Sequence, residues 1–527
     1  MKVLICDGLH QSGLDLLRAA GEIEIDAPEQ PGMEEIRAKL PDCDALIIRS
    51  RTKITADMLQ KSGRLKVIGR AGTGVDNIDT AAASSRGILV MNTPGANAMA
   101  AAEHTLALML ALARHIPQAA RSVREGKWEK KRFMGTELYQ QTLGIVGLGK
   151  IGSIVADRAV GMHMEVLAYD PYVTREAASS LGIQLVSLDE LLSRSHFITV
   201  HTPLTPETER IINRSTIAGM RQGAFIVNCA RGGLVDEEAL YEALSSGHLG
   251  GAALDVFASE PPAGNPLVSL ENVVCTPHLG ASSIQAQANV ARTIASQLID
   301  YLKHGIIRNA VNFPSISSKA YEKLRPYLVL AESLGRLQGQ LCTVIERLEI
   351  EYSGPDLQEV PLQPVTQTVV KGLLEPVLAE KVNLVNAPIL LRERQIRLVT
   401  SSTSEPRGYT GMITVRVGCR GKQISAASGT VFPGEGPRLI RLNDYRLEAQ
   451  LEGINLIIQN LDRPGVIGFV GSTLGKFGVN IADMHLSRTS DRDKAIAIIR
   501  IDEEAPAGAV AALQDYKDIV SVQQVRL

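Results

Sequence analysis

The sequence predicts an α/β protein with two doubly wound, parallel-sheet lobes, followed by an α+β domain and a terminal βαββαβ unit. From Lys2 to Pro277, short β-rich runs alternate with amphipathic segments, which is typical of β-α-β units with parallel strands. Residues 320–342 have a helical pattern, and the strand-like runs that follow them favour an antiparallel or mixed sheet. The chain has 527 residues, too many for one core when a domain holds ~100–200 residues.

The first lobe is expected at residues 1–95, completed by residues 284–313. Its strand candidates are "VLIC", "ALIIRS", "LKVIGRAG" and "ILVMN", and "GLDLLRAAG" and "MEEIRAKL" have helical periodicity. Residues 94–121 predict one apolar helix long enough to connect the two lobes. A later helix that begins near Ser282 would bring the chain back to the first lobe.

The second lobe is expected at residues 96–283, with strands at "TLGIVG", "MEVLAYD", "FITVHT", "AFIVNCA", "GAALDVF" and "NVVCTP". The serine-containing stretch "VNFPSISSK" (311–319) is typical of a linker. An α+β domain is expected at 318–450. Residues 452–527 have the order β-α-β-β-α-β, the ferredoxin-like arrangement.

Composition excludes several classes of protein. With 45% hydrophobic and 21% charged residues and a net charge of −2, neither nucleic acid nor a membrane surface is expected as the principal partner. The six cysteines lack C-x-x-C spacing, so we expect small buried side chains in a reducing compartment rather than a disulfide framework or a zinc site. No metal-ligand spacing occurs, and the longest apolar run, Thr105 to Ala113, is far too short to span a membrane. A cytoplasmic protein without a metal is the expectation.

A glycine-rich turn follows the first strand of the second lobe. Gly147, Gly149 and Gly152 form G-x-G-x-x-G, and Asp170 ends the next strand. The first glycine allows a tight turn, the second lets backbone N–H groups approach a pyrophosphate, and the third lets helix pack on strand, which is typical of a Rossmann-like lobe. The Asp170 carboxylate suits a ribose 2′-hydroxyl and would repel a 2′-phosphate, so NAD is predicted; the alternative is an ordinary turn residue before Pro171.

Three functional side chains follow strands of this lobe: Arg231 in "NCARGG", Glu260 in "DVFASEPP" and His278 in "TPHLGAS". Ligands of open α/β sheets bind beyond the carboxyl ends of the strands, so the three are expected to converge. An arginine can hold a 2-oxo acid and polarise its carbonyl, a histidine can exchange a proton near neutral pH, and a glutamate can orient that histidine. Taken singly, each could instead be a strand-end ion pair, a core histidine or a solvated loop residue.

Five stretches together resemble the D-isomer-specific 2-hydroxyacid dehydrogenase family: "GRAGTGVDNID", "GIVGLGKIG", "NCARGGLVDEEAL", "GAALDVFASEPP" and "TPHLGAS". The resemblance implies an Arg–Glu–His active site at the three positions above. It also implies that His104, like His201 and Cys229, is a packing or cofactor contact rather than a base or nucleophile. The NAD contacts it implies, beyond the glycines of the turn, are Thr73, Lys150, Ile151, Asp170, Thr202, Cys229, Ala230, Asp255, Gly280 and Ala281.

Basic clusters suit a phosphorylated substrate. Arg49, Arg51 and Lys53 lie in "IIRSRTKIT", while Lys131 and Arg132 lie in "REGKWEKKRF", a run that could equally be a solvated face. "KWEKKRFMGTEL" and the C-terminal extension resemble the long members of the family, which oxidise D-3-phosphoglycerate to 3-phosphohydroxypyruvate in L-serine biosynthesis. That resemblance implies a homodimer or homotetramer in which Trp128 packs at the dimer contact, and the backbone of Gly72 and Gly74 meets the substrate carboxylate.

The stretch "NLDRPGVIGFVGSTLGKFGVNIADMHLSR" resembles the start of an ACT domain, an amino-acid-sensing module, and residues 318–450 resemble the intervening domain of the long members. The resemblance implies L-serine as an effector, held at a shared edge by Asn460, Asp462 and Asn480. Asp462 could instead be an N-cap. Arg438, Arg441 and Arg446 are a candidate anion site.

Two other functions remain open from the sequence. A glyoxylate or hydroxypyruvate reductase would not need the basic clusters and normally lacks the C-terminal extension. A dehydrogenase-like corepressor, which binds NAD without turnover, can keep the same Arg–Glu–His set, although the sensing module and the lack of disordered tails disfavour it.

Overall fold

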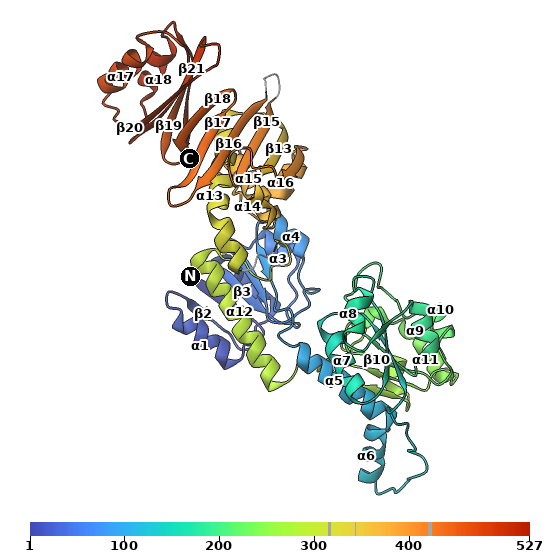
Figure 1. Cartoon of the computed structure of the whole chain (residues 1–527). Helices are drawn as coiled ribbons and strands as arrows, with labels where there is room; N and C mark the ends of the chain where they lie inside the picture. Colours follow the sequence, from blue (N-terminus) through green and yellow to red (C-terminus); the bar gives the residue numbers. More distant parts are fainter. Residues whose placement is uncertain (315–317, 343, 420–423) are drawn as a thin grey trace.

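The computed structural model describes residues 1–314, 318–342, 344–419 and 424–527, which form four sheets (Figure 1). The first sheet has the order β2-β1-β3-β4-β5 and is parallel throughout. Its strands are β1 (Lys2–Ile5), β2 (Glu24–Asp26), β3 (Ala45–Ile48), β4 (Val67–Arg70) and β5 (Leu89–Met91), joined by α1 (Gln11–Ala19), α2 (Met33–Lys39), α3 (Ala56–Gln60) and α4 (Thr80–Ser85). The predicted strands are confirmed; β2 was not foreseen.

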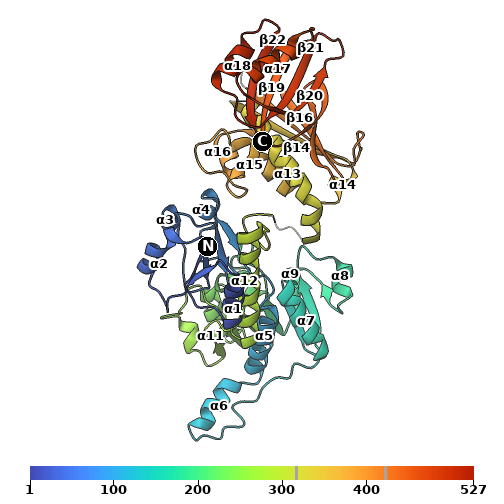
Figure 2. The same ribbon diagram turned by 90° about the vertical axis from the view of Figure 1, so that its left-hand side faces the viewer.

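The returning helix is also confirmed. Helix α12 (Ile284–His304) packs Val290, Ile294 and Leu298 into the same core as Val3 and Ile5 of β1. A chain segment from beyond the second lobe therefore completes the first, as Figure 2 shows.

The second sheet is parallel with the order β12-β11-β10-β9-β6-β7-β8. Its strands are β6 (Thr142–Val146), β7 (Glu165–Tyr169), β8 (Gln184–Leu185), β9 (Phe197–Val200), β10 (Phe225–Asn228), β11 (Gly251–Leu254) and β12 (Val273–Cys275). One face is covered by α5 (Ala98–Ala113), α7 (Lys150–Gly161) and α8 (Arg175–Ser179), the other by α9 (Leu188–Arg194), α10 (Arg214–Ala218) and α11 (Glu237–Ser245). This is the doubly wound arrangement that the alternation predicts.

The single helix predicted over residues 94–121 is wrong in one respect: it is two helices. Helix α5 ends before His115, which has a left-handed φ of 51°, and α6 (Ile116–Arg124) then runs in a new direction. Pro117 in the first turn of α6 lacks an N–H and would clash inside a continuous helix, so the chain turns before it. Helix α6 and the segment after it project from the lobe as an arm (Figure 1).

The third sheet is mixed, with the order β14-β13-β15-β16-β17-β18 and one parallel pair, β13 with β14. The strands are β13 (Ile345–Ser353), β14 (Arg397–Thr403), β15 (Met412–Cys419), β16 (Ser425–Phe432), β17 (Gly436–Leu442) and β18 (Tyr445–Gln450); the helices are α13 (Ser318–Leu341), α14 (Pro355–Gln358), α15 (Gln363–Leu374) and α16 (Ala387–Glu393). A Cβ at Gly335 of α13 would collide with the Val369 carbonyl of α15, so glycine permits this close helix pair.

The expectation that the cysteines form no disulfide is wrong. Cys342, just after α13, and Cys419, at the end of β15, are disulfide-bonded with a Cα–Cα distance of 5.9 Å. Their sequence separation of 77 residues gives no local spacing signal, and only the packing of α13 on the sheet brings them together. Cys6, Cys43, Cys229 and Cys275 are free.

The last sheet confirms the ferredoxin-like order, with β19 (Ile454–Leu461), α17 (Val466–Lys476), β20 (Ile481–Arg488), β21 (Lys494–Ile501), α18 (Ala507–Gln514) and β22 (Ile519–Arg526), arranged β20-β21-β19-β22. One face packs on its two helices. From the other face, Ile457, Ile496, Ile498 and Val525 enter the hydrophobic core of the intervening domain. The two C-terminal domains therefore share one core.

The intervening domain also docks on the first lobe. Asn383 donates its side-chain N–H to the Gly87 carbonyl at 2.7 Å, and Val385, 6% exposed, joins the core of the first lobe. Part of the predicted linker, residues 315–317, lies outside the described residues. Within the described parts of the chain, no helix is long and apolar enough to cross a membrane, and no three His, Cys, Asp or Glu side chains cluster as a metal site.

Candidate active site

The glycine turn lies where the strand order of the second sheet reverses, with β6 between β7 and β9. Gly147 has a left-handed φ of 96°, and Gly149 is the N-cap of α7. A Cβ at Gly152 would meet the Gly147 carbonyl oxygen well inside 3.0 Å, whereas a Cβ at Gly149 would meet nothing within 4 Å. The turn thus has the tight bend, the open helix N-terminus and the close packing that a dinucleotide-binding turn requires.

Asp170 follows β7 and is bound by two backbone N–H groups. Its Oδ2 accepts from Leu148 in the glycine turn at 2.8 Å, and its Oδ1 accepts from Tyr172 at 2.9 Å. Asp170 therefore also stabilises the turn before Tyr172, as expected if it were an ordinary turn residue. Across the turn, a Cβ at Gly147 would meet Thr202, whose buried Oγ1 has no hydrogen-bond partner among the described residues. A polar ligand such as NAD fits this edge because it would satisfy that hydroxyl.

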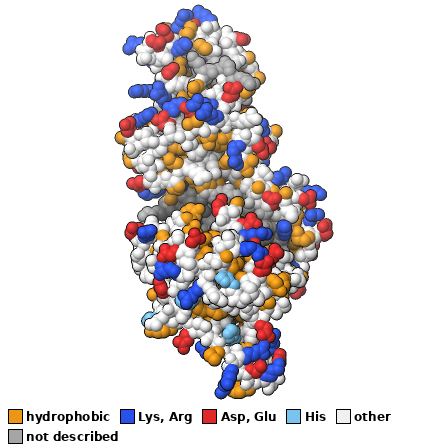
Figure 3. Space-filling model, turned by 90° about the vertical axis from the view of Figure 1, so that its right-hand side faces the viewer, with side chains coloured by type: hydrophobic (Ala, Val, Ile, Leu, Met, Phe, Trp, Pro, Cys, Tyr) orange, Lys and Arg blue, Asp and Glu red, His pale blue; other side chains and the backbone are white. Residues whose placement is uncertain are grey.

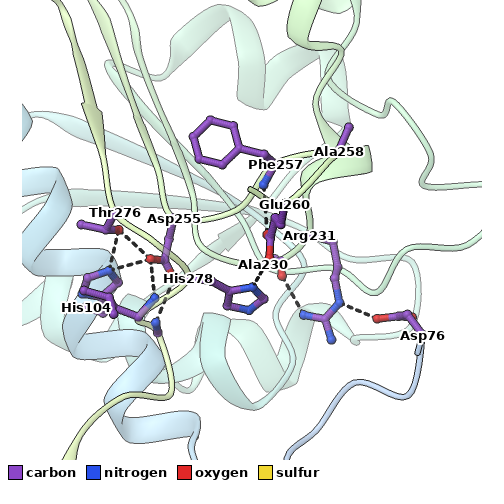
Figure 4. A network of polar contacts seen from close by, with 12 residues as sticks. Asp76, His104, Ala230, Arg231, Asp255, Phe257, Ala258, Glu260, Thr276 and His278 are labelled. Carbon is purple, nitrogen blue, oxygen red and sulfur yellow. Dashed lines mark hydrogen bonds and ion pairs between the residues drawn. The ribbon is translucent and has the colours of Figure 1, made fainter. Parts of the chain in front are cut away.

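The predicted histidine and glutamate meet directly (Figure 4). His278 Nδ1 lies 2.8 Å from Glu260 Oε2, and Glu260 Oε1 accepts the Phe257 N–H at 3.2 Å. His278 has a left-handed φ of 55° and donates its own N–H to the carbonyls of Asp255 and Thr276, both at 3.0 Å. Because a carboxylate only accepts, Nδ1 carries the hydrogen, and Nε2 remains for a ligand.

Arg231 reaches across to the first lobe (Figure 4). Its Nε donates to Asp76 Oδ2 at 2.9 Å, and its Nη1 donates to the Ala230 carbonyl at 2.7 Å. A Cβ at Gly74 would collide with Nη2, so the guanidinium lies against the glycine loop of the first lobe. The predicted strand-end ion pair therefore exists, but it connects the two lobes and directs the cation into the space between them.

Burial removes two nearby groups from acid–base chemistry. Desolvation lowers the pKa of His201 to about 4, and desolvation raises the pKa of the Cys229 thiol to about 12. At neutral pH His201 is uncharged and Cys229 is a thiol, so neither is a strong proton donor or nucleophile.

The predicted phosphate cations are placed unequally. Arg49 is partly buried, and burial lowers its pKa. Arg51 is engaged by Asp7, with Nε–Oδ1 at 3.0 Å, and Lys53 is exposed. Lys131 and Arg132 lie on the arm, where Arg132 pairs with both oxygens of Glu271 at 2.9 and 2.8 Å. Glu271 precedes β12 and so lies at the amino ends of the parallel strands, whereas His278 follows β12 at their carboxyl ends. The arm, which is paired to Glu271, therefore does not bring its cations to the site of its own chain.

Arg70, at the end of β4, was missed from the sequence. Burial, followed by the charges of Arg231 and Arg49, lowers its pKa to about 10. Its buried Nε has no hydrogen-bond partner within the described residues, and its Nη1 donates a long hydrogen bond, 3.4 Å, to the Ala71 carbonyl oxygen. A buried cation beside two others is costly unless an anion binds there. The signal in the sequence was "GRAG", an arginine at a strand end before a glycine loop, as at Arg231.

Several other predicted contacts line the same crossing between lobes. Thr73 Oγ1 donates to Asn97 Oδ1 at 2.8 Å, and Lys150 Nζ donates to the Pro94 carbonyl at 3.2 Å. Asp255 accepts from the Gly280 N–H at 2.8 Å. Gly72, Ala230 and Ala281 lie in loops beside Arg70, Arg231 and Gly280 respectively, and Ile151 lies in the first turn of α7 beside Lys150.

The effector candidates are not all together in one chain. Asn460 and Asp462 line a cavity of about 990 Å³ with Arg441, Arg446 and Arg488, and the Asn460 Oδ1 is buried without a partner among the described residues. Asn480 lies at the other end of the strands, because Ile481 pairs with Ile501, and Ile501 with Ile454. Asn480 donates instead to Asp502 at 2.7 Å. Arg438 turns toward Glu435 and does not line this cavity.

Comparison with known proteins gives a consistent assignment. Residues 106–280 match the family described as D-isomer specific 2-hydroxyacid dehydrogenase, NAD binding domain. Residues 323–443 match the D-3-phosphoglycerate dehydrogenase intervening domain, and residues 454–518 match the ACT domain. D-3-phosphoglycerate dehydrogenase of Methanocaldococcus jannaschii is 43% identical over 100% of both chains. That of Bacillus subtilis is 38% identical over 100% of this chain and 99% of its own.

Solved structures match the two N-terminal lobes. A Thermus thermophilus protein is 39% identical with a TM-score of 0.55, and covers 59% of this chain and 100% of its own. A glyoxylate reductase of Paecilomyes thermophila is 27% identical with a TM-score of 0.55, and covers 59% of this chain and 98% of its own. The reductase thus covers little more than half of this chain, whereas the two D-3-phosphoglycerate dehydrogenases match its full length. The chain belongs to the D-3-phosphoglycerate dehydrogenases, NAD-dependent members of the D-isomer specific 2-hydroxyacid dehydrogenase family.

Proposed function

We propose that the chain oxidises D-3-phosphoglycerate with His278 as the general base and Arg231 as the substrate-binding cation. The His278–Glu260 pair, 2.8 Å apart and beside Arg231 in Figure 4, is the observation that carries this proposal. When bound, NAD supplies the hydride acceptor at its nicotinamide ring. The chain supplies the groups that bind the acid and remove its proton.

The proton leaves through His278. With Nδ1–H donated to Glu260, the lone pair of Nε2 is free to take the proton of the substrate 2-hydroxyl as the C2 hydrogen departs with its electron pair. The Glu260 carboxylate then stabilises the imidazolium that forms. In the reverse direction the imidazolium returns the proton to the carbonyl oxygen of 3-phosphohydroxypyruvate.

Different arginines are assigned to the carboxylate and to the phosphate of the substrate. Arg231 presents Nη2 at the Gly74 loop, where its planar fork and the backbone N–H groups of that loop suit a carboxylate. Arg70 and Arg49 are partly buried close to one another, and burial lowers the pKa of both despite the nearby carboxylate of Asp7, which suits the phosphate because a further anion would stabilise both cations. This assignment gives the phosphate a site that an unphosphorylated hydroxy acid would leave empty.

The test is NADH consumption with 3-phosphohydroxypyruvate, compared with unphosphorylated hydroxypyruvate. We expect a strong preference for the phosphorylated acid, a fall in kcat of ~10²–10⁴ for His278→Ala, and a rise in KM for Arg231→Lys. His248→Ala is a matched control, because the His248 ring hydrogen-bonds the Ile217 carbonyl of α10 and precedes β11, at the end of the strands away from His278. Wild-type kcat in His278→Ala, or no preference for the phosphorylated acid, would refute the proposal.

Feedback by L-serine is proposed at a site made by two chains. Strand β20 is an edge strand, and pairing two copies antiparallel would bring Asn480 of one beside the Arg488 end of the other, near Asn460 and Asp462. The unpartnered Asn460 Oδ1 supports this because an ammonium group would satisfy it. Rates at rising L-serine should fall for wild type and for the exposed control Asp515→Ala, but not for Asp462→Ala. Identical curves would exclude the site.

The arm is proposed as the dimer contact. Trp128 is 75% exposed and Met134 is 79% exposed, which is unusual for a surface without a partner. Charged side chains gather at the same tip (Figure 3). A second copy packed there would carry Lys131 and Arg132 toward its neighbour's site. Trp128→Glu should shift the molar mass measured by light scattering toward that of a monomer, and an unchanged mass would contradict the assignment.

A further inference from the structure

A buried carboxylate holds the loop that carries His278. Asp255, at the end of β11, has a side chain fully excluded from solvent. Its Oδ1 accepts the Leu279 N–H at 2.7 Å and the Thr276 hydroxyl at 2.5 Å, and its Oδ2 accepts the Gly280 N–H at 2.8 Å. The Asp255 carbonyl accepts the His278 N–H. The left-handed backbone of His278 is therefore fixed on both sides by one residue.

His104 reaches the same carboxylate from helix α5 (Figure 4). Its Nε2 lies 3.2 Å from Asp255 Oδ1 and 3.1 Å from Thr276 Oγ1. An ionised carboxylate only accepts, and the Thr276 hydroxyl already donates to it, so Nε2 must carry a hydrogen and donate. Burial acts to raise the pKa of Asp255, but the hydrogen bond from His104 and those of the loop outweigh it and lower that pKa.

The hydrogen bond of His104 lies close to the crossing between the two lobes. Helix α5 begins after Asn97, directly where the chain enters from the first lobe, and Asn97 accepts from Thr73 of that lobe at 2.8 Å. His104 lies in the second turn of the helix. The hydrogen bond therefore connects the crossing between the lobes to the loop that presents the imidazole of His278.

We propose that His104 is a positioning residue for hydride transfer: by donating to Asp255 it fixes the carboxylate that orients the His278 loop. The inference rests on the proposed role of His278. Among the described residues the hydrogen bonds of His104 go to Asp255 and Thr276 and not to Glu260 or Arg231, so we expect its effect to be on geometry and not on substrate charge. Small displacements of a reacting group are costly, because a shift near 1 Å can lower a rate by ~10²-fold.

The experiment compares His104→Ala with His104→Gln, whose amide N–H can replace the Nε2 donor. With 3-phosphohydroxypyruvate and NADH, kcat of the alanine variant should fall about 10–100-fold with little change in KM for the acid, and glutamine should restore most of it. Glu103→Ala, the exposed neighbour on α5, should keep the wild-type kcat. Thermal unfolding of both His104 variants tests for a merely structural role, which would lower the midpoint without a rescue of kcat by glutamine.

Two results would overturn the inference: a wild-type kcat in His104→Ala, or equal losses in the alanine and glutamine variants. His278→Ala in the same assay separates this failure from that of the proposed function. If His278→Ala is inactive while His104→Ala is fully active, only the positioning role fails. If His278→Ala is itself fully active, the proposed mechanism fails and the positioning role falls with it.

Discussion

The glycine turn allows one prediction to be worked from distances. A Cβ at Gly152 would lie well inside 3.0 Å of the Gly147 carbonyl oxygen, a separation that Cβ atoms essentially never show, so the start of α7 must move away from the glycine turn by close to an ångström. Overpacking of this kind costs ~1–3 kcal/mol. At ~2–4 °C per kcal/mol for a lobe of this size, Gly152→Ala should lower the thermal midpoint by roughly 2–12 °C. It should also weaken NADH binding, because the helix N-terminus moves.

Two glycines of the same helix give the matched controls. Gly149→Ala meets nothing within 4 Å and needs no unusual φ, so the midpoint should hold, while NADH affinity falls about tenfold or more because the methyl group occupies the approach to the helix N-terminus. Gly161→Ala, at the end of α7, should leave both quantities unchanged. Differential scanning calorimetry and NADH fluorescence titration measure the two. The reasoning is refuted if Gly149→Ala and Gly152→Ala lose the same stability, or if Gly149→Ala binds NADH as wild type does.

Three further predictions concern the rest of the chain. Arg70→Met should raise KM for 3-phosphohydroxypyruvate at least tenfold and leave the dissociation constant of NADH unchanged. The thermal midpoint should not fall, because the substitution removes a cation whose Nε has no hydrogen-bond partner among the described residues; an unchanged KM would exclude Arg70 from the phosphate site. The disulfide closes a span of 77 residues, so replacing Cys342 and Cys419 by serine should cost up to about 4 kcal/mol in denaturant unfolding, and the variant should no longer respond to dithiothreitol. Val385→Asp should release the intervening domain from the first lobe, seen as a larger radius of gyration by small-angle scattering at unchanged NADH affinity.

Local pattern was enough to predict the elements that position the site. The G-x-G-x-x-G turn and the strand ends at Arg231 and His278 are signals carried within a few residues, and the carboxyl ends of parallel strands must share one edge. For that reason the His278–Glu260 contact could be expected before any coordinates.

What the sequence did not predict depends on separate segments meeting. Arg70 becomes unusual only because Arg231 and Arg49 lie beside it in the same buried space. Cys342 and Cys419 are neighbours only after α13 has packed on β15. Asn480 matches the effector motif by residue type, yet strand register sends it to the opposite end of the sheet from Asn460.

The same packing sets the route by which an effector could reach the active site. The face of the last sheet shares a core with the intervening domain, and the intervening domain inserts Val385 into the first lobe, which carries Arg70 and Arg49. A rearrangement among the C-terminal domains would therefore meet the substrate side of the cleft first, while the NAD lobe is joined to the first lobe by the crossings near Asn97 and Ser283 and by the Arg231–Asp76 ion pair. Spatial connection alone does not establish coupling, because both sites must bias one two-state element. Val385→Asp supplies that evidence: if L-serine still binds but no longer changes the rate, the docked Val385 segment transmits the signal, and if inhibition persists, the route runs between subunits instead.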